Sequence, residues 1–433
     1  MATSLSIALP SGGPVAVIWG IVPSFLGNLC MAASLAEICH VYPTSGGQYH
    51  WSAILAPAEH AAWVSWVCGW FATCGWIALV GTAGSLAGSL ITGAIALQND
   101  SYTQKPWNVF LIYTGYTLIA MAVNIWALPI LPRLNQAAIF WSLIGAVVIL
   151  ITCLSRSAGN FASPKFVFTQ FINETGWPNG IAWILGLLQS SFGLTGYDAV
   201  SHMVEEMPEP HKYAPRVMIL AVCIGAGSSF IFLICLLFCI KDITAVNTAA
   251  AGPLLTAIYQ GTKNSNGVPV PAVLLNTALV IIFGCVYLGS SAALNAILSS
   301  SVVSLNISYC VPIAIVLIRG RGILRPPSLP EPTFTLGPIL GPVCNIFGLV
   351  FTTVTTVFFL FPPAIPVTGS SMNYASAVFG LVGIISAITW FLQGRKDFIG
   401  PRDLGALLEL ARTEVMPNAR QGKHATTIVE DSE

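Results

Sequence analysis

Residues 181–207 read IAWILGLLQSSFGLTGYDAVSHMVEEM, an apolar stretch that could cross a bilayer as a helix but is interrupted at its middle. Gly193, Gly196 and the acidic Asp198 occupy positions where a membrane helix is normally uniform. Broken helices occur in membrane proteins where the freed backbone groups line a cavity, and their half-helix ends can then bind charged groups. An ionisable residue at this depth is a functional candidate by default. The alternative is a packing kink in which Asp198 is hydrogen-bonded to a neighbouring helix.

The rest of the chain contains further apolar stretches of the length that a helix needs to cross about 30 Å of hydrocarbon. They lack the alternating pattern of barrel strands, and only helices or closed barrels satisfy their backbone in lipid. The sequence therefore predicts an all-α polytopic membrane protein. Met1–Pro10 is apolar but too short to cross, which predicts the second half of a helix whose first half is absent. The ten predicted spans are 13–38, 61–97, 107–128, 137–155, 181–207, 215–240, 271–290, 293–318, 340–361 and 374–392.

The composition excludes several classes of protein. Hydrophobic residues make up 55% of the 433 and charged residues only 8%, which argues against a soluble globular enzyme. Of the 17 basic and 17 acidic residues, 13 follow Gly394, so we expect a transmembrane domain at 1–393 and a polar cytosolic tail at 394–433. The net charge is zero and no basic block occurs, so nothing predicts nucleic-acid binding.

No chemistry-bearing motif indicates an enzyme. The 11 cysteines form no CxxC pair or Cys/His metal spacing, so we expect no disulfide framework, metal site or cofactor. The six histidines are scattered, and neither a GxSxG elbow nor a phosphate-binding loop is present. A secondary transporter is consistent with these absences, whereas an ATP-driven pump is not. A channel is disfavoured because no pore motif repeats.

Four titratable residues near span ends could carry protons or close a cytosolic gate. Glu37 ends the first full span, and Glu205 and Glu206 end the interrupted one. Their alternative role is that of solvated helix-end charges. His202 follows Asp198 by four residues and would share its helical face, which predicts either a titrating pair or a buried structural histidine.

Two glycosylation sequons fall in connections between spans. They begin at Asn99 and Asn173. Counting the spans between them places both connections on one side, which we expect to be extracellular or lumenal. A third sequon, at Asn306, lies inside a predicted span and is disregarded.

Residues 36–51, AEICHVYPTSGGQYHW, contain the pattern A-E-x5-P-x-S-G-G-x-Y. This pattern resembles the amino acid/polyamine/organocation permeases, and the continuation WSAILAP at 51–57 resembles their fungal amino acid, gamma-aminobutyrate and choline branch. Further similarity lies in Gly196–Ala199 with Glu205 and Glu206 after it, and in SYCVPI at 308–313. The resemblance covers roughly residues 1–400.

The resemblance implies a leucine-transporter-type fold of twelve helices with two inverted five-helix repeats. Substrate would bind between the broken first and sixth helices, coupled to a cation gradient. Phe192 then corresponds to an aromatic gate, and the backbone of Gly193, Leu194, Thr195, Gly196 and Tyr197 would hold the substrate. Asp198 would meet its amine. Ser142 occupies the place of a lysine that mimics the coupling ion in some relatives, so that lysine mechanism would be absent here.

The chain also departs from the family pattern. We expect the first half of the family's helix 1 to be missing, because this sequence starts after the position where it would lie. The family's helix 8 also has no counterpart between Lys263 and Pro269. The ten spans would then be helices 2–7 and 9–12. Restoring a helix 8 puts nine Lys and Arg of the short connections inside and five outside, in agreement with both sequons. Without it, the same rule would place both sequons in the cytosol, so charge alone leaves the two topologies open.

The sequence thus predicts a carrier of amino acids or related amines (gamma-aminobutyrate, choline) that works by alternating access and is proton-coupled. Its partners would be the small-molecule substrate, a proton or another coupling cation, and the lipid bilayer. The expected location is the plasma membrane, with the vacuolar membrane as the alternative. The competing hypothesis from another class is a non-transporting sensor or truncated isoform that keeps the scaffold without the site.

Overall fold

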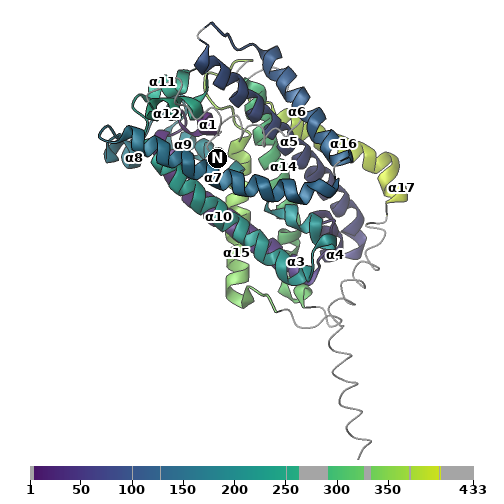
Figure 1. Cartoon of the computed structure of the whole chain (residues 1–433). Helices are drawn as coiled ribbons and strands as arrows, with labels where there is room; N and C mark the ends of the chain where they lie inside the picture. Colours follow the sequence, from purple (N-terminus) through teal and green to yellow (C-terminus); the bar gives the residue numbers. More distant parts are fainter. Residues whose placement is uncertain are drawn as a thin grey trace, which may run out of the picture.

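The computed structural model describes residues 4–262, 291–325, 333–369, 372–398 and Gly400, apart from positions 100, 127 and 250. Throughout this part of the chain the regular elements are helices, gathered into one bundle (Figure 1). The long helices are α3 (Ile21–Val41), α5 (Ala58–Gln98), α6 (Pro106–Trp126), α7 (Leu131–Ser157), α9 (Asn179–Leu194), α10 (Pro210–Phe238), α14 (Ser291–Arg319), α15 (Gly337–Phe359) and α16 (Ala375–Thr389).

Shorter helices connect or extend these spans. They are α1 (Leu5–Ala8), α2 (Gly13–Trp19), α4 (Gln48–Leu55), η2 (Leu128–Ile130), α8 (Pro164–Thr169), η3 (Tyr197–Glu206), α11 (Ile243–Thr248), α12 (Pro253–Thr262), η4 (Arg321–Leu324), η5 (Trp390–Gly394) and α17 (Arg395–Asp397). The single turn of α1 lies in the predicted partial helix at 1–10.

The observed helices agree closely with the predicted spans. Among the described residues, eight continuous helical segments are long and apolar enough to cross a membrane. The predicted span 181–207 is divided between α9 and η3, which accounts for the ninth. The predicted span 271–290 and the tail after Gly400 lie outside the described residues.

Apolar side chains on the outer faces of the peripheral helices are exposed. On α7, Ile139, Phe140 and Ile151 are 61%, 66% and 60% exposed, and α15 shows the same pattern with Ile339 at 79%. Contiguous apolar surface of this kind is costly in water, whereas lipid tails solvate it without cost. The bundle is therefore built to sit in a bilayer.

Inside the bundle, glycines let helices approach closely. A Cβ on Gly75 of α5 would lie 2.7 Å from Leu305 Cγ of α14, and one on Gly348 of α15 would lie 2.8 Å from Met31 Sδ of α3. At Gly75 the backbone N of Leu305 is also within 2.9 Å, so a side chain there would force α5 and α14 apart, whereas at Gly348 the flexible Met31 side chain would have to move. These contacts pack α5 against α14 and α15 against α3 inside the bundle.

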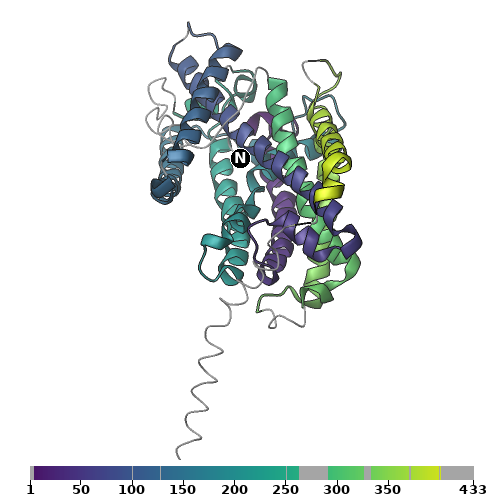
Figure 2. The ribbon, with the colours of Figure 1, turned by 90° about the vertical axis from the view of Figure 1, so that its right-hand side faces the viewer.

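The 41 residues of α5 exceed what a straight crossing needs, as the sequence predicts. At 1.5 Å per residue the helix is about 60 Å long, roughly twice the hydrocarbon thickness. Figure 2 shows it running obliquely through the bundle. Its far end packs through Ala94 against Ala251 and Leu255, beyond the end of α10. The helix thus crosses the bundle at a tilt, and its far end is packed against the segment that contains Ala251 and Leu255.

Candidate functional site

The predicted interruption of the span 181–207 is present between α9 and η3. Gly196 adopts a left-handed conformation with φ of +95°, which favours glycine. The hydroxyl of Thr195 donates to the carbonyl of Ser191 at 2.7 Å and so satisfies one backbone group that the ending helix leaves free. The chain then resumes as the tight turns of η3. The sequence places the break here because glycine and a small polar residue interrupt an otherwise apolar helix.

Asp198, the first acidic residue after the break, is completely buried. Gln48 Nε2 donates to its Oδ2 at 2.6 Å, and the Tyr309 hydroxyl donates to its Oδ1 at 2.5 Å. His202 Nε2 lies 3.6 Å from Oδ2. The carboxylate therefore joins η3 to α4 and α14, two elements far away in the sequence.

The charge on Asp198 has little compensation. In the described residues, no lysine or arginine pairs with it, and its one potential cationic neighbour is His202. His202 Nδ1 lies 2.8 Å from the Ser45 carbonyl, which can only accept, so this nitrogen carries a hydrogen. A second proton on Nε2 would then face Asp198. Buried carboxylates favour a nearby cation or a proton, so the site is suited to bind one of these.

The segment Ser45–Gln48 contains the glycine pair of the motif and packs along η3. The Ser45 hydroxyl donates to Glu205, and Gln48 donates to Asp198. Gly47 has φ of +55°, and a Cβ at this position would lie 2.7 Å from Ser201 Oγ. Any other residue would thus push η3 away. The glycine is needed so that the two segments can touch.

A cavity of about 1050 Å³ lies beside this contact, bounded by α4, α5, η3 and Phe398. Its wall is rich in aromatic rings, including those of Trp66, Trp70 and Trp76. His202 and His50 also border it, and burial lowers the pKa of His50 to about 4. The aromatic faces suit an organic cation, because ring faces attract positive charge.

The predicted substrate-contact residues before Asp198 lie in packed surroundings. Phe192 packs in a cluster with Leu187 and Leu298, and Leu194 and Tyr197 are buried in the main core. The ring of Tyr197 lies 5.2 Å from that of Tyr309. Two smaller cavities, of about 510 and 150 Å³, lie near Glu37 and near Ser6. Residues Phe192–Asp198 border none of these three cavities.

The remaining gating candidates are not gathered at one point. Glu205 and Glu206 are both exposed, and Glu205 is hydrogen-bonded to Ser45, which borders the large cavity. Ser142 is exposed on α7, a helix that packs against α10 and α12 rather than η3. The structure therefore places His202 beside Asp198 and joins Glu205 to Ser45, whose carbonyl lies 2.8 Å from His202 Nδ1, and it leaves Ser142 away from them.

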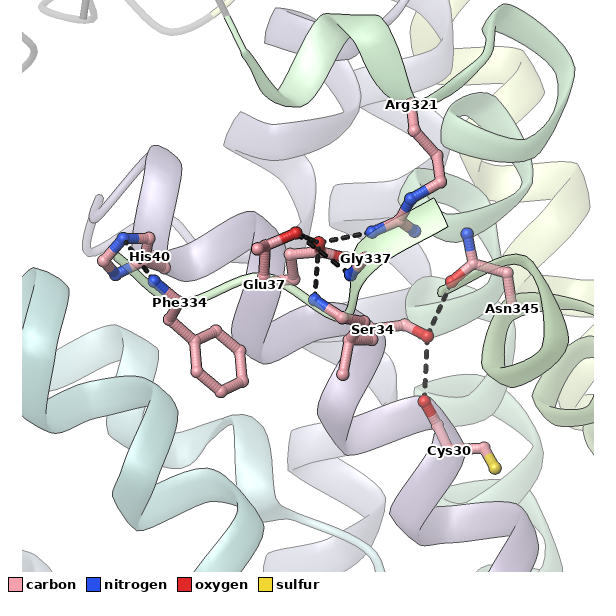
Figure 3. A network of polar contacts seen from close by, with 10 residues as sticks. Cys30, Ser34, Glu37, His40, Arg321, Phe334, Gly337 and Asn345 are labelled. Atoms are coloured by element: carbon pink, nitrogen blue, oxygen red, sulfur yellow. Dashed lines mark hydrogen bonds and ion pairs between the residues drawn. The ribbon is translucent and has the colours of Figure 1, made fainter. Parts of the chain in front are cut away.

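Glu37 lies in a separate polar cluster at the end of α3 (Figure 3). Its Oε1 accepts from Arg321, from the Thr335 hydroxyl at 2.9 Å and from the Leu336 N–H at 3.0 Å. The side chain is buried and its partners flank the start of α15. Glu37 thus pairs with Arg321 and accepts the N–H of Leu336, the residue that precedes α15.

Two further side chains of α3 extend this cluster along the same helix (Figure 3). Ser34 donates to Asn345 Oδ1 of α15 at 2.7 Å. His40 accepts from the Phe334 N–H at 3.3 Å, and its Nδ1 lies 2.5 Å from the His211 carbonyl. The cluster fastens α3 to the α14–α15 connection and to α10.

The two candidate glycosylation residues lie at the end of the bundle away from the large cavity. Asn99 follows the last residue of α5, and Asn173 forms a short backbone bridge with Ser11. The side chain of Asn247 donates to Glu174, next to Asn173. Among the described residues, no three His, Cys, Asp or Glu side chains gather as a metal site requires.

Sequence reasoning missed three residues of the Asp198 network: Ser45, Gln48 and Tyr309. All three fall inside the two motifs that carry the family resemblance, at 36–51 and 308–313. Their polar character within apolar surroundings was a signal that could have identified them. Their partner could not be deduced, because 150 residues separate Gln48 from Asp198 and 111 separate Tyr309 from it.

Comparison with known proteins identifies the family of the chain. The family described as amino acid permease matches residues 1–263 and 259–384, and the two matches meet where helix 8 is expected to be missing. The choline transporter of Saccharomyces cerevisiae is 30% identical over 92% of this chain and 78% of its own length. Amino-acid permease BAT1 of Arabidopsis thaliana is 28% identical over 92% of the chain and 89% of its own length. The swainsonine transporter swnT of Arthroderma benhamiae is 27% identical over 91% of this chain and 87% of its own length.

These matches cover nearly all of the described bundle, including the break at Gly196 and the motif at Ser45–Gln48 that packs along η3. The all-helical architecture is consistent with the leucine-transporter-type fold expected of such proteins. The chain is an integral, multi-pass membrane protein that belongs to the amino acid permease family of the amino acid/polyamine/organocation superfamily.

Proposed function

We propose that this chain is a secondary active carrier of amino acids or related amines, including choline and gamma-aminobutyrate, working by alternating access. The observation that carries this proposal is Asp198, a fully buried carboxylate at a helix break with no lysine or arginine partner among the described residues. An ammonium group is its chemical complement, because a cation offsets the cost of keeping the charge out of water.

Access to Asp198 requires only a local rearrangement. The large cavity reaches Ala199 and His202, which are the next residue and the next turn of η3. Gln48 and Tyr309 belong to α4 and α14, so a shift of η3 relative to these helices would release both hydrogen bonds. We infer that the described conformation is the one in which Asp198 is sealed, and that substrate binding exposes it.

The proton is the coupling cation in this proposal. His202 borders the cavity and faces Asp198, so a proton arriving from water meets His202 first. Glu205 lies nearby through Ser45 and is the next acceptor. Phe192 would close the site on the opposite side, and the backbone of Gly193–Tyr197 would hold the substrate. The proposed location is the plasma membrane, with the vacuolar membrane as the alternative.

Uptake into transporter-deficient cells tests the proposal. Labelled choline, gamma-aminobutyrate and a panel of amino acids would be supplied to cells with and without the chain, at matched surface expression. We expect saturable uptake of at least one substrate, increased at lower external pH and abolished by a protonophore. Uptake unchanged by the protonophore would reject proton coupling, and no uptake of any substrate would reject the carrier.

The second candidate is a non-transporting sensor of the same substrates. It is favoured by one observation in the described part of the chain, that Phe192–Asp198 border none of the three cavities named above. A sensor would bind labelled substrate in purified form with no flux into proteoliposomes. Binding together with flux would exclude it.

A further inference from the structure

The two sequons lie at the same end of the bundle, but the Asn173 sequon is packed into a folded loop and the Asn99 sequon is exposed. The outer end of α5, just before Asn99, packs on Ala251, and α11 reaches Glu174 through Asn247. Both acceptor residues are therefore on one side of the membrane. Whether either can be modified depends on how freely its side-chain nitrogen and the following hydroxyl can be approached.

Asn173 is part of the folded structure. Its Oδ1 accepts from the Thr175 N–H at 3.0 Å and from the Thr175 hydroxyl at 2.7 Å. Its Nδ2, the atom that would carry a sugar, donates to the Trp177 carbonyl at 2.6 Å and to Asn179 at 3.0 Å. Thr175 is only 2% exposed. Every polar atom that a glycosylating enzyme must reach is thus engaged or covered.

The surrounding loop holds this arrangement in place. The Glu174 N–H donates to the Pro10 carbonyl at 2.8 Å, and the Ile365 N–H donates to the Thr175 carbonyl at 2.7 Å. Trp177 Nε1 donates to the Pro362 carbonyl at 3.1 Å. Three separate segments of the chain would have to part before Asn173 could enter an enzyme.

Asn99 differs in each of these respects. Asn99 and Ser101 are both exposed, and among the described residues Asn99 Nδ2 has no hydrogen-bond partner. The Asn99 Oδ1 accepts from the Ser101 N–H at 3.1 Å, which orients the amide and leaves its nitrogen free. Asn99 directly follows the last residue of α5, in a connection whose Asn99 and Ser101 side chains lie at the surface.

We propose that Asn99 carries an N-linked glycan and that Asn173 does not. In the reaction, Asn99 Nδ2 bonds to the anomeric carbon of an oligosaccharide attached to a lipid pyrophosphate. The bond from that carbon to the pyrophosphate oxygen breaks, the lipid pyrophosphate leaves, and the transferring enzyme takes the proton from Nδ2. Because this transfer occurs on the lumenal side, the end with Asn99 faces the lumen or the exterior and the large cavity faces the cytosol. The inference is independent of transport.

The test expresses the full chain in eukaryotic cells and compares its gel mobility before and after an enzyme that removes N-glycans. We expect a shift of one glycan for the wild type and for Asn173→Gln, and no shift for Asn99→Gln or Ser101→Ala. Asn173→Gln can fail to fold because it loses several hydrogen bonds. Peptide mass spectrometry on the deglycosylated wild-type chain therefore provides the second measurement, with conversion to aspartate expected at position 99 and unmodified asparagine at 173.

Two results would overturn the inference. A glycan at position 173 would show that the loop opens before modification. The absence of any glycan on the wild-type chain would show that Asn99 is not an acceptor and would remove the assignment of this end to the lumen. Uptake measured on Asn99→Gln separates these outcomes from the proposed carrier activity, since we expect it to equal that of the wild type.

Discussion

Replacing Asp198 by asparagine removes one charge and leaves the shape of the side chain nearly unchanged. Tyr309, 2.5 Å away, can still donate to the remaining oxygen. Gln48 Nε2 would face the new NH2 group, but Gln48 Oε1 is buried without a partner, so turning the amide of Gln48 restores a hydrogen bond. We therefore expect Asp198→Asn to fold.

The expected effect of Asp198→Asn on the free energy of unfolding is smaller than its expected effect on uptake. A hydrogen bond to a charged group contributes about 1.5–3 kcal/mol and a neutral one about 0.5–1.5 kcal/mol. Each of the two bonds to Asp198 would weaken by about 1 kcal/mol, and the lower cost of burying a neutral amide offsets part of this loss. Recognition of an ammonium group has no such compensation, so we expect kcat/KM for uptake to fall about tenfold or more.

Two further variants complete the measurement of Asp198. Tyr309→Phe keeps the charge and removes one donor, so it should lower the free energy of unfolding by about 1.5–3 kcal/mol. Glu206→Gln changes an exposed carboxylate of η3 and should alter neither property. The assays are thermal unfolding in detergent and initial uptake rates at several substrate concentrations. Wild-type uptake kinetics for Asp198→Asn would refute the role of its charge, and destabilisation equal to that of Tyr309→Phe would refute the amide rearrangement.

Three other variants test the surroundings of the site by thermal unfolding. Glu37→Gln leaves the Arg321 guanidinium without its carboxylate and should destabilise by about 3 kcal/mol, and Arg321→Gln in addition should recover part of the loss. Burial lowers the pKa of His50 from 6.5 to about 4. Between these pH values the unfolded chain binds a proton at His50 and the folded chain does not, so the free energy of unfolding is unaffected by His50 above pH 6.5 and decreases as the pH falls toward 4. His50→Gln should therefore flatten the fall in melting temperature between pH 6.5 and 4. Gly47→Ala should destabilise by about 1–3 kcal/mol, because φ of +55° and contact with Ser201 both oppose a side chain.

Matched controls distinguish these effects from general ones. Glu209 and Lys212 form an exposed pair, and their double-mutant cycle should give under about 1 kcal/mol of coupling, less than that of the buried pair. His60 is 53% exposed, and His60→Gln is the matched control for the removal of a histidine side chain. Gly69 has room for a Cβ, with Tyr49 at 3.6 Å, so Gly69→Ala should leave stability unchanged. Equal effects in a variant and its control would contradict the corresponding prediction.

The spans were predictable because their physical requirement is local. About 20 consecutive apolar residues are needed to cross the hydrocarbon, and this requirement is met within each segment whatever its neighbours do. The break at Gly196 was predictable for the same reason, since glycine and a polar residue interrupt such a segment. Even the excess length of α5 follows from counting residues between Ala58 and Gln98.

The partners of the charged residues were not predictable, because they depend on how distant helices pack. From the sequence alone, Glu37 could be a proton relay, a gate residue or a solvated charge. In the structure it is buried against Arg321, 284 residues away, and the Leu336 N–H at the start of α15. No local pattern links these residues. A single sequence shows that a charge needs a partner, but only the packed structure identifies which one.

At Ser45–Gln48 the sequence pattern and the contacts in the structure explain different features of the motif. Its glycines suggest a turn, which alone would explain any loop between two spans. Contact with η3 explains more, because Ser45 bonds Glu205, Gly47 admits Ser201 and Gln48 holds Asp198. Each residue meets a different residue of η3, so the motif fixes the position of the whole half-helix. A change at Ser45 or Gly47 would therefore act on Asp198 without touching it, and we expect such variants to alter uptake and stability together, whereas Asp198→Asn mainly alters uptake.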